Sequence, residues 1–215
     1  MSIKASIWYL QAATEMTLAR GYLPVGENGP DRLAFFQGLS VLAARIENGE
    51  PLGVNDLPSE YEVRRSDPNR NLNLPMWHSS FVHVRQDVAA VLRRFDLGQT
   101  VLAPIRIAMA DGAGVNTEFC LLAVGNRKPT VDPARSAPKK YGRMRWGPFQ
   151  TYEGVGVDKN VVALRSVLEG PDIWRAPEVT GTIFVSDRLG QALLAEEWGR
   201  KLKPRKVRVA VADGA

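Results

Sequence analysis

In two segments of the chain, the apolar residues are first spaced as in a strand and then as in a helix. In the first, strand-like residues around Val82 are followed by apolar positions at i, i+3, i+4 and i+7: Val88, Val91, Leu92 and Phe95. In the second, the β-branched and aromatic run Thr182–Val185 leads to Ser186 at an N-cap position, and then to Leu189, Ala192 and Leu193. Both segments are therefore predicted to be strand-to-helix units.

Further apolar runs predict more strands. Ile7–Gln11 reads as a strand, and Val101–Ala110 and Val115–Val124 read as two strands joined across Asp111–Gly114 in a hairpin. Ile105, Ile107 and Met109 alternate to one face of the hairpin. Val161–Leu168 fits either a strand or a short helix. Together these elements predict an α+β fold with a mixed or antiparallel sheet and a few packed helices.

One apolar segment does not reveal its structure. Phe35–Ile46 is apolar nearly throughout, and it fits either a pair of strands around Gly38 or a buried helix. Periodicity alone does not separate the two, because a fully buried element of either kind is apolar on all sides.

Glycine and proline divide the chain after this segment. Residues 48–75 are rich in both and read as loop. They separate an N-terminal acidic part, residues 1–75, from an α+β domain at 76–199 and a basic tail at 200–215. The loop fits a linker between two domains or a long surface loop over one core.

Charge is distributed unevenly along the chain. The net charge is +5, but residues 1–62 carry eight acidic and four basic side chains, a net of −4. Basic residues gather at 127–145 and at 200–208. Such clusters are typical of solvated surfaces and also of nucleic-acid-binding proteins, so a nucleic-acid-binding or regulatory module is the alternative interpretation.

The sequence offers no recognisable catalytic or metal-binding set. His78 and His83 are five residues apart, with no cysteine or acidic pair to complete a ligand set, and Cys120 lies in an apolar run typical of the core. No phosphate-binding or nucleophile motif is present, so we predict no enzyme activity, no cofactor and no metal. An enzyme with a dispersed site is a third interpretation, which a deep pocket joining a histidine to carboxylates would support.

Localisation follows from the same residues. No stretch approaches the roughly 20 apolar residues of a membrane helix. A single cysteine excludes an intramolecular disulfide and fits a cytoplasmic, soluble protein.

Several short motifs, taken in order, resemble those of a known family. They are FVHVRQDVAAVLRRF, the hairpin end FCLLAVGNRKPTVDPARS with Val131, Asp132 and Ser136, the element Ile173, Trp174 and Arg175, and the segment Ile183–Leu193. This order, over about residues 76–195 with a weaker match through FFQGLSV, is similar to the Imm11 group of bacterial immunity proteins.

The resemblance implies a protein without catalytic activity that binds and neutralises a cognate toxin, encoded by a neighbouring gene in a polymorphic toxin system. Aromatic and Arg side chains are typical anchors of protein interfaces. We therefore expect contact at Arg143, Arg145, Trp146 and Tyr152. If the toxin is basic, complementarity favours the acidic N-terminal part, including Glu60 and Glu62.

Overall fold

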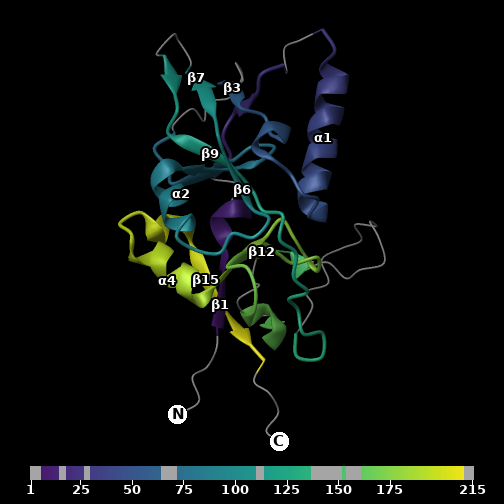
Figure 1. Ribbon diagram of the computed structural model, residues 1–215, viewed down its shortest axis with the longest axis vertical. Helices are drawn as coiled ribbons and strands as arrows, with labels where there is room; N and C mark the ends of the chain where they lie inside the picture. Colours follow the sequence, from purple (N-terminus) through teal and green to yellow (C-terminus); the bar gives the residue numbers. More distant parts are fainter. Residues whose placement is uncertain are drawn as a thin grey trace, which may run out of the picture.

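The computed structural model describes residues 6–14, 18–26, 30–63, 72–109, 114–136, 152–153 and 161–210 (Figure 1). Its described α-helices are α1 (Arg32–Asn48), α2 (Gln86–Leu92) and α4 (Asp187–Ala195). Short 3-10 helices are η1 (Gln11–Thr14), η3 (Val54–Asp56), η5 (Arg165–Leu168) and η6 (Gly199–Leu202). With the strands below, they confirm the predicted α+β class.

The largest sheet joins the two ends of the chain. Its order is β11-β15-β1-β14-β12, and its strands are β11 (Val162–Ala163), β15 (Pro204–Val209), β1 (Ser6–Leu10), β14 (Ile183–Ser186) and β12 (Ile173–Arg175). β1 is antiparallel to both of its neighbours, with Ser6 opposite Arg208 and Ile7 opposite Ser186. The first described strand therefore lies between two of the last.

Two four-stranded sheets and a small pair complete the strands. One sheet contains β4 (Met76–His78), β5 (Val82–Arg85), β9 (Phe119–Ala123) and β6 (Val101–Pro104), in that order. Another contains β2 (Tyr22–Pro24), β3 (Glu60–Val63), β7 (Arg106–Ala108) and β8 (Val115–Asn116). The pair is β10 (Tyr152–Glu153) with β13 (Val179–Thr180).

Alternation along the strands creates a core on each face of the large sheet. Trp8 and Leu10 of β1 point to one face, where α2 and α4 pack, and Ile7 and Tyr9 point to the other, where Trp174 lies. A third cluster lies in the upper half of Figure 1, and its buried aromatic side chains are Tyr22, Tyr61, Trp77, Phe81 and Phe119.

Both predicted strand-to-helix units are present. β5 runs into α2, and β14 runs into α4. The Ser186 hydroxyl accepts a hydrogen bond from the Leu189 amide at 3.2 Å, as an N-cap residue should. The predicted hairpin is also confirmed, since β6 pairs with β9 and β7 with β8, and Ile105 and Ile107 are buried together.

Two segments differ from their predicted structure. The loop expected over residues 48–75 contains strand β3. Its sequence, EYEV, was not recognised as a strand because its outward side chains are charged. The basic tail expected at 200–215 contains η6 and β15. In β15 the basic side chains of Arg205, Lys206 and Arg208 are exposed while Val207 and Val209 are buried, so the strand has one solvated face. No helix among the described residues is long and apolar enough to cross a membrane.

Candidate binding surface

Helix α1 is the segment whose structure the sequence left undecided. Asp31 caps its N-terminus, because the Asp31 carboxylate accepts from the Ala34 amide at 3.0 Å. Gly49 ends it in the left-handed conformation, with φ at 72°, and its amide donates to the carbonyls of Arg45 and Ile46. These caps explain why Phe35–Ile46 is a helix and not a pair of strands.

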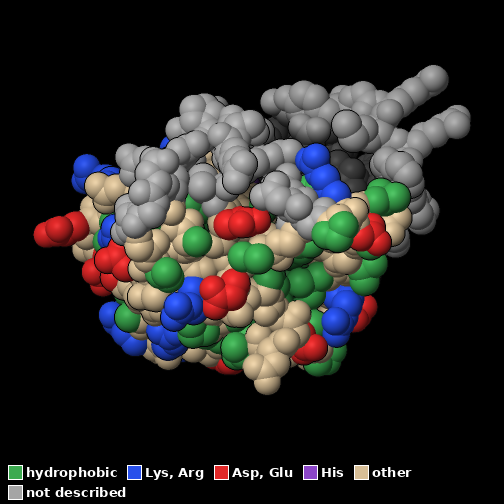
Figure 2. Space-filling view, turned by 90° about the horizontal axis from the view of Figure 1, so that it is seen from above, with side chains coloured by type: hydrophobic (Ala, Val, Ile, Leu, Met, Phe, Trp, Pro, Cys, Tyr) green, Lys and Arg blue, Asp and Glu red, His purple; other side chains and the backbone are tan. Residues whose placement is uncertain are grey.

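Of the two alternatives left open, the helix is present, but it is exposed over most of its surface and not buried. Ile46 is its one buried residue, and Leu39, Leu42 and Ala43 pack partly against the third cluster. Leu33 and Val41 remain 72% and 62% exposed. Figure 2 shows the molecule from above. Hydrophobic side chains gather toward the right of this view, the side on which α1 stands in Figure 1, and acidic side chains lie at their margin. Contiguous exposed apolar surface of this kind is typical of sites that bind another protein.

An open hollow of about 510 Å³ runs along one flank of α1, between the helix and the segment that leads from η3 to β3. We call it the α1 groove, and its lining residues are Ala34, Phe35, Gly38, Leu39, Val41, Leu42, Arg45, Asp56, Leu57 and Pro58. Arg45 and Asp56 are the only charged residues in this set. The groove therefore suits an apolar segment better than a polar ligand.

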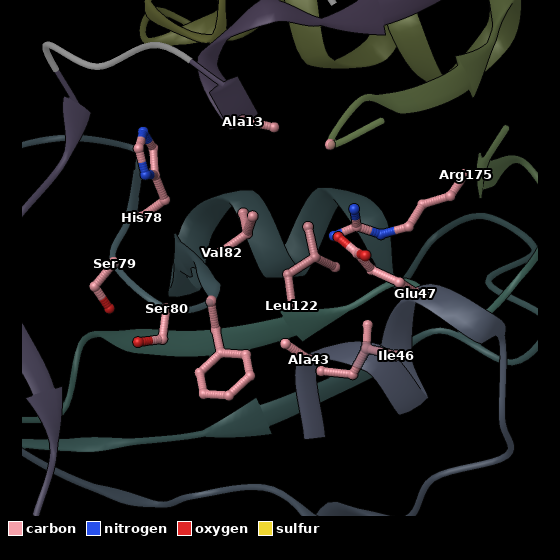
Figure 3. Close-up of a pocket in the computed structure, with 12 residues that line it drawn as sticks. Ala13, Ala43, Ile46, Glu47, His78, Ser79, Ser80, Val82, Leu122 and Arg175 are labelled. Atoms are coloured by element: carbon pink, nitrogen blue, oxygen red, sulfur yellow. The ribbon is translucent and has the colours of Figure 1, made fainter. Parts of the chain in front are cut away.

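A second, more polar cleft lies near the C-terminal end of α1. It comprises two hollows of about 160 and 200 Å³ that share Glu47, Arg175 and Gly181. Figure 3 shows Glu47 and Arg175 pointing toward each other, with His78 and Ser79 across the cleft. Burial lowers the pKa of Arg175, Glu47 opposes that shift, and the positive charge of Arg127 adds to it.

Among the described residues, the Arg175 Nε atom has no hydrogen-bond partner. The cleft thus offers a partly compensated guanidinium group, which suits a carbonyl or carboxylate oxygen. The smaller of the two hollows gathers His78, Ser79 and Glu47, the combination of a histidine with a carboxylate that an enzyme would need. The Ser79 hydroxyl has no hydrogen-bond partner among the described residues, so it is not paired with a base there.

A comparison with protein families matches residues 28–209 to the immunity protein family Imm11. The chain belongs to the Imm11 family. A comparison with curated proteins found no match. The Imm11 match begins just before α1 and ends with β15, so it includes α1, its groove and the polar cleft.

Most of the motif residues that suggested Imm11 make contacts that hold the fold together. Ser136 donates to the Val162 carbonyl and accepts from the Val162 amide, which ties the segment after β9 to β11. Trp174 is fully buried, and its indole nitrogen donates to the Thr130 hydroxyl at 3.0 Å. Arg175 is the exception, because it lines the polar cleft.

The predicted contact residues of this Imm11 protein are only partly placed. Arg143, Arg145 and Trp146 lie outside the described residues, and Tyr152 is described only through its backbone pairing with Val179. Glu60 and Glu62 lie in β3, and the Glu60 carboxylate is 3.2 Å from Arg106 Nε, with both side chains more than half exposed. Glu60 and Glu62 thus lie in the strand that follows Pro58 of the α1 groove.

Other sequence candidates are structural. His83 is fully buried and stacks on Trp77 with 3.8 Å between ring centroids, and Cys120 is buried as predicted. Within the described ranges, no group of three or more His, Cys, Asp or Glu side chains is placed to hold a metal ion.

Two members of the basic clusters are engaged within the fold. The Lys128 ammonium donates to the carbonyls of Val167, Glu169 and Pro171, and lies 4.2 Å from the Trp174 ring centroid. Lys206 lies over the Trp8 ring and 3.9 Å from the Asp187 carboxylate. The Lys128 charge is therefore held by contacts within the fold, whereas the Lys206 side chain remains 53% exposed.

Proposed function

We propose that this Imm11 protein binds a cognate bacterial toxin, encoded by a neighbouring gene, and neutralises it in the cytoplasm of the cell that makes both. The observation that carries the proposal is the Imm11 match over residues 28–209. The exposed apolar surface of α1 supports it, because a protein that acts by binding needs such a surface.

In this proposal, the protein neutralises the toxin by covering its active site. An interface of about 1,200–2,000 Å² with a few aromatic or Arg anchors is enough to cover an active site. The α1 groove and the polar cleft supply surface for it. Arg143, Arg145, Trp146, Tyr152, Glu60 and Glu62 are proposed as additional contact residues.

Co-expression tests this function directly. An inactivated variant of the neighbouring gene product should co-purify with the full chain as a stable complex. The active toxin should arrest growth when expressed alone, and the full chain should restore growth. If the two proteins do not associate, or if growth is not restored, the proposal is wrong.

A nucleic-acid assay separates this function from the alternative. Direct binding to duplex or single-stranded probes at low salt, weakening steeply as salt rises, would favour the nucleic-acid-binding module. We expect no such binding in the absence of the toxin.

A further inference from the structure

Gly38 lies in the middle of α1, where a glycine lowers helix stability relative to alanine. Close packing against a neighbouring side chain is one reason for a glycine in a helix. Gly190 in α4 is an example, because a Cβ atom there would lie 2.3 Å from the Trp8 ring. At Gly38, a Cβ atom would meet none of the described atoms within 4 Å. The packing described for this chain does not explain why the position lacks a side chain.

The missing side chain opens the α1 groove. Ala34 lies one turn before Gly38, so this flank of the helix carries little side-chain bulk. Leu42 and Leu57 line the hollow beside it. A partner segment can therefore approach the helix backbone closely at Gly38.

The charges around the groove indicate the chemistry of that segment. Residues 33–44 contain no charged side chain. Arg45 is compensated, because its Nε atom donates to the Glu50 carboxylate at 2.9 Å. The Asp56 carboxylate accepts only from the Gly53 amide, at 2.7 Å, among the described residues, and is exposed. Asp56 thus leaves a negative charge at the edge of an apolar groove, in the part of the chain with a net charge of −4.

We propose that the α1 groove receives an apolar segment of the toxin, with a Lys or Arg beside it that pairs with Asp56. The inference rests on the proposed function and adds the surface and the chemistry of the partner. A stable interface needs about 800 Å² from each protein, so exposed Leu33 of α1, which lies outside the groove lining, also takes part.

A matched pair of variants tests the groove. Gly38→Gln places a long side chain in the groove, and Ser40→Gln places the same side chain about 160° around the helix, on the exposed opposite flank. Glutamine is a good helix former, so both variants should fold. Calorimetry or surface plasmon resonance with the inactivated neighbouring gene product should show at least tenfold weaker binding for Gly38→Gln. Ser40→Gln should bind within about twofold of the wild type, since it leaves the groove open.

Asp56→Asn tests the charge. Its amide oxygen can still accept from the Gly53 amide, so the local turn is kept and only the charge is lost. The affinity of Asp56→Asn for the toxin should be lower at low salt and less sensitive to added salt than that of the wild type.

The outcomes separate this inference from the proposed function. If the wild type binds the toxin and Gly38→Gln binds equally well, the groove proposal is overturned while the function stands. If the wild type forms no complex, the function fails and the groove loses its proposed occupant. If Gly38→Gln instead turns a wild-type dimer into a monomer in sedimentation, with toxin affinity unchanged, the occupant is a second copy and the proposal is wrong.

Discussion

At the scale of single residues, Asp172 fixes the junction between β12 and α4. Its side chain is 2% exposed, and it accepts from Arg188 Nε at 2.6 Å, from the Ser186 hydroxyl at 2.6 Å and from the Asp96 amide at 3.0 Å. Burial alone would raise the pKa of Asp172, but the hydrogen bonds from Arg188 and Ser186 outweigh burial and hold the pKa below its ordinary value. The ionised carboxylate therefore stabilises the folded state.

We predict that Asp172→Asn lowers the free energy of unfolding by about 2–4 kcal/mol, because it leaves buried donors with a neutral amide in place of the charge. Urea denaturation followed by circular dichroism measures the loss. Asp87→Asn is the control, since Asp87 also pairs with Arg85, at 2.6 Å, but on the surface. That control should cost less than about 1 kcal/mol. Equal costs for the two variants would contradict the role assigned to Asp172.

His83 is the second residue at this scale, and its burial makes the stability of the protein depend on pH. Burial lowers its pKa to about 3, the charge of His78 acts in the same direction, and the Phe81 backbone opposes them. The Tyr61 ring packs edge-on, with 4.9 Å between the centroids, and Trp77 stacks on the other side. A buried neutral histidine takes up no proton near pH 6, whereas the unfolded chain does.

Stability is therefore predicted to fall with acid. Below pH 6.5 the unfolded state binds one more proton at His83 than the folded state, so the free energy of unfolding drops by about 2 kcal/mol between pH 7 and pH 5. Urea titrations at pH 7, 6 and 5 measure the slope. His83→Gln should flatten it, while His78→Gln should retain it because His83 is still present. An unchanged slope in His83→Gln would show that another group titrates.

At the scale of elements, α4 packs so closely on β1 that it has no room for a methyl group at Gly190. The Trp8 ring that blocks this position is held by its hydrogen bond to the Asp187 carboxylate at 2.8 Å. We predict that Gly190→Ala costs about 1–3 kcal/mol of stability through overpacking, despite the better helix propensity of alanine.

Gly38→Ala is the matched comparison for Gly190→Ala, because the same change in α1 meets open space. It should raise the free energy of unfolding by about 0.5–1 kcal/mol. Thermal unfolding of both variants should therefore show a higher melting temperature for Gly38→Ala and a lower one for Gly190→Ala than for the wild type. A destabilised Gly38→Ala protein would mean that α1 packs differently from the structure.

The two helices also show what the sequence could predict. α4 was predictable because Ser186 caps it and Leu189 and Leu193 place its apolar face on one side. α1 was left undecided because it is apolar on its exposed face as well, and such a pattern looks the same as burial. Its caps, Asp31 and Gly49, were the local signal for a helix. The groove depends on the placement of η3 against α1, and no local pattern reports that contact.

At the scale of the whole molecule, the large sheet depends on pairs of residues that lie 194 to 202 positions apart in the sequence. Ser6 lies opposite Arg208, and β15 stands between β1 and β11. Such pairings leave no mark on local periodicity, which is why the basic segment at 200–215 read as a tail. The alternation of exposed Arg and Lys with buried Val207 and Val209 was the available signal for a strand.

This topology predicts that the protein needs its last strand in order to fold. A chain that stops after Lys203 loses β15, so β1 and β11 lose their shared neighbour. The core on the face of the large sheet where Trp174 lies also loses Val207 and Val209. Removing two buried valines and the strand that carries them costs several kcal/mol, comparable with the whole stability of a domain. The shortened chain should show no cooperative thermal transition in calorimetry and should aggregate through its open sheet edges.

A chain that stops after Ala210 is the control, because β15 ends at Val209. It should keep the cooperative transition of the full chain. A synthetic peptide of residues 204–210, added in excess to the shortened chain, should restore part of that transition, since strand addition to an open edge replaces the missing hydrogen bonds. A cooperative transition in the chain ending at Lys203 without the peptide would show that the sheet is stable without its inner strand, and would refute this dependence.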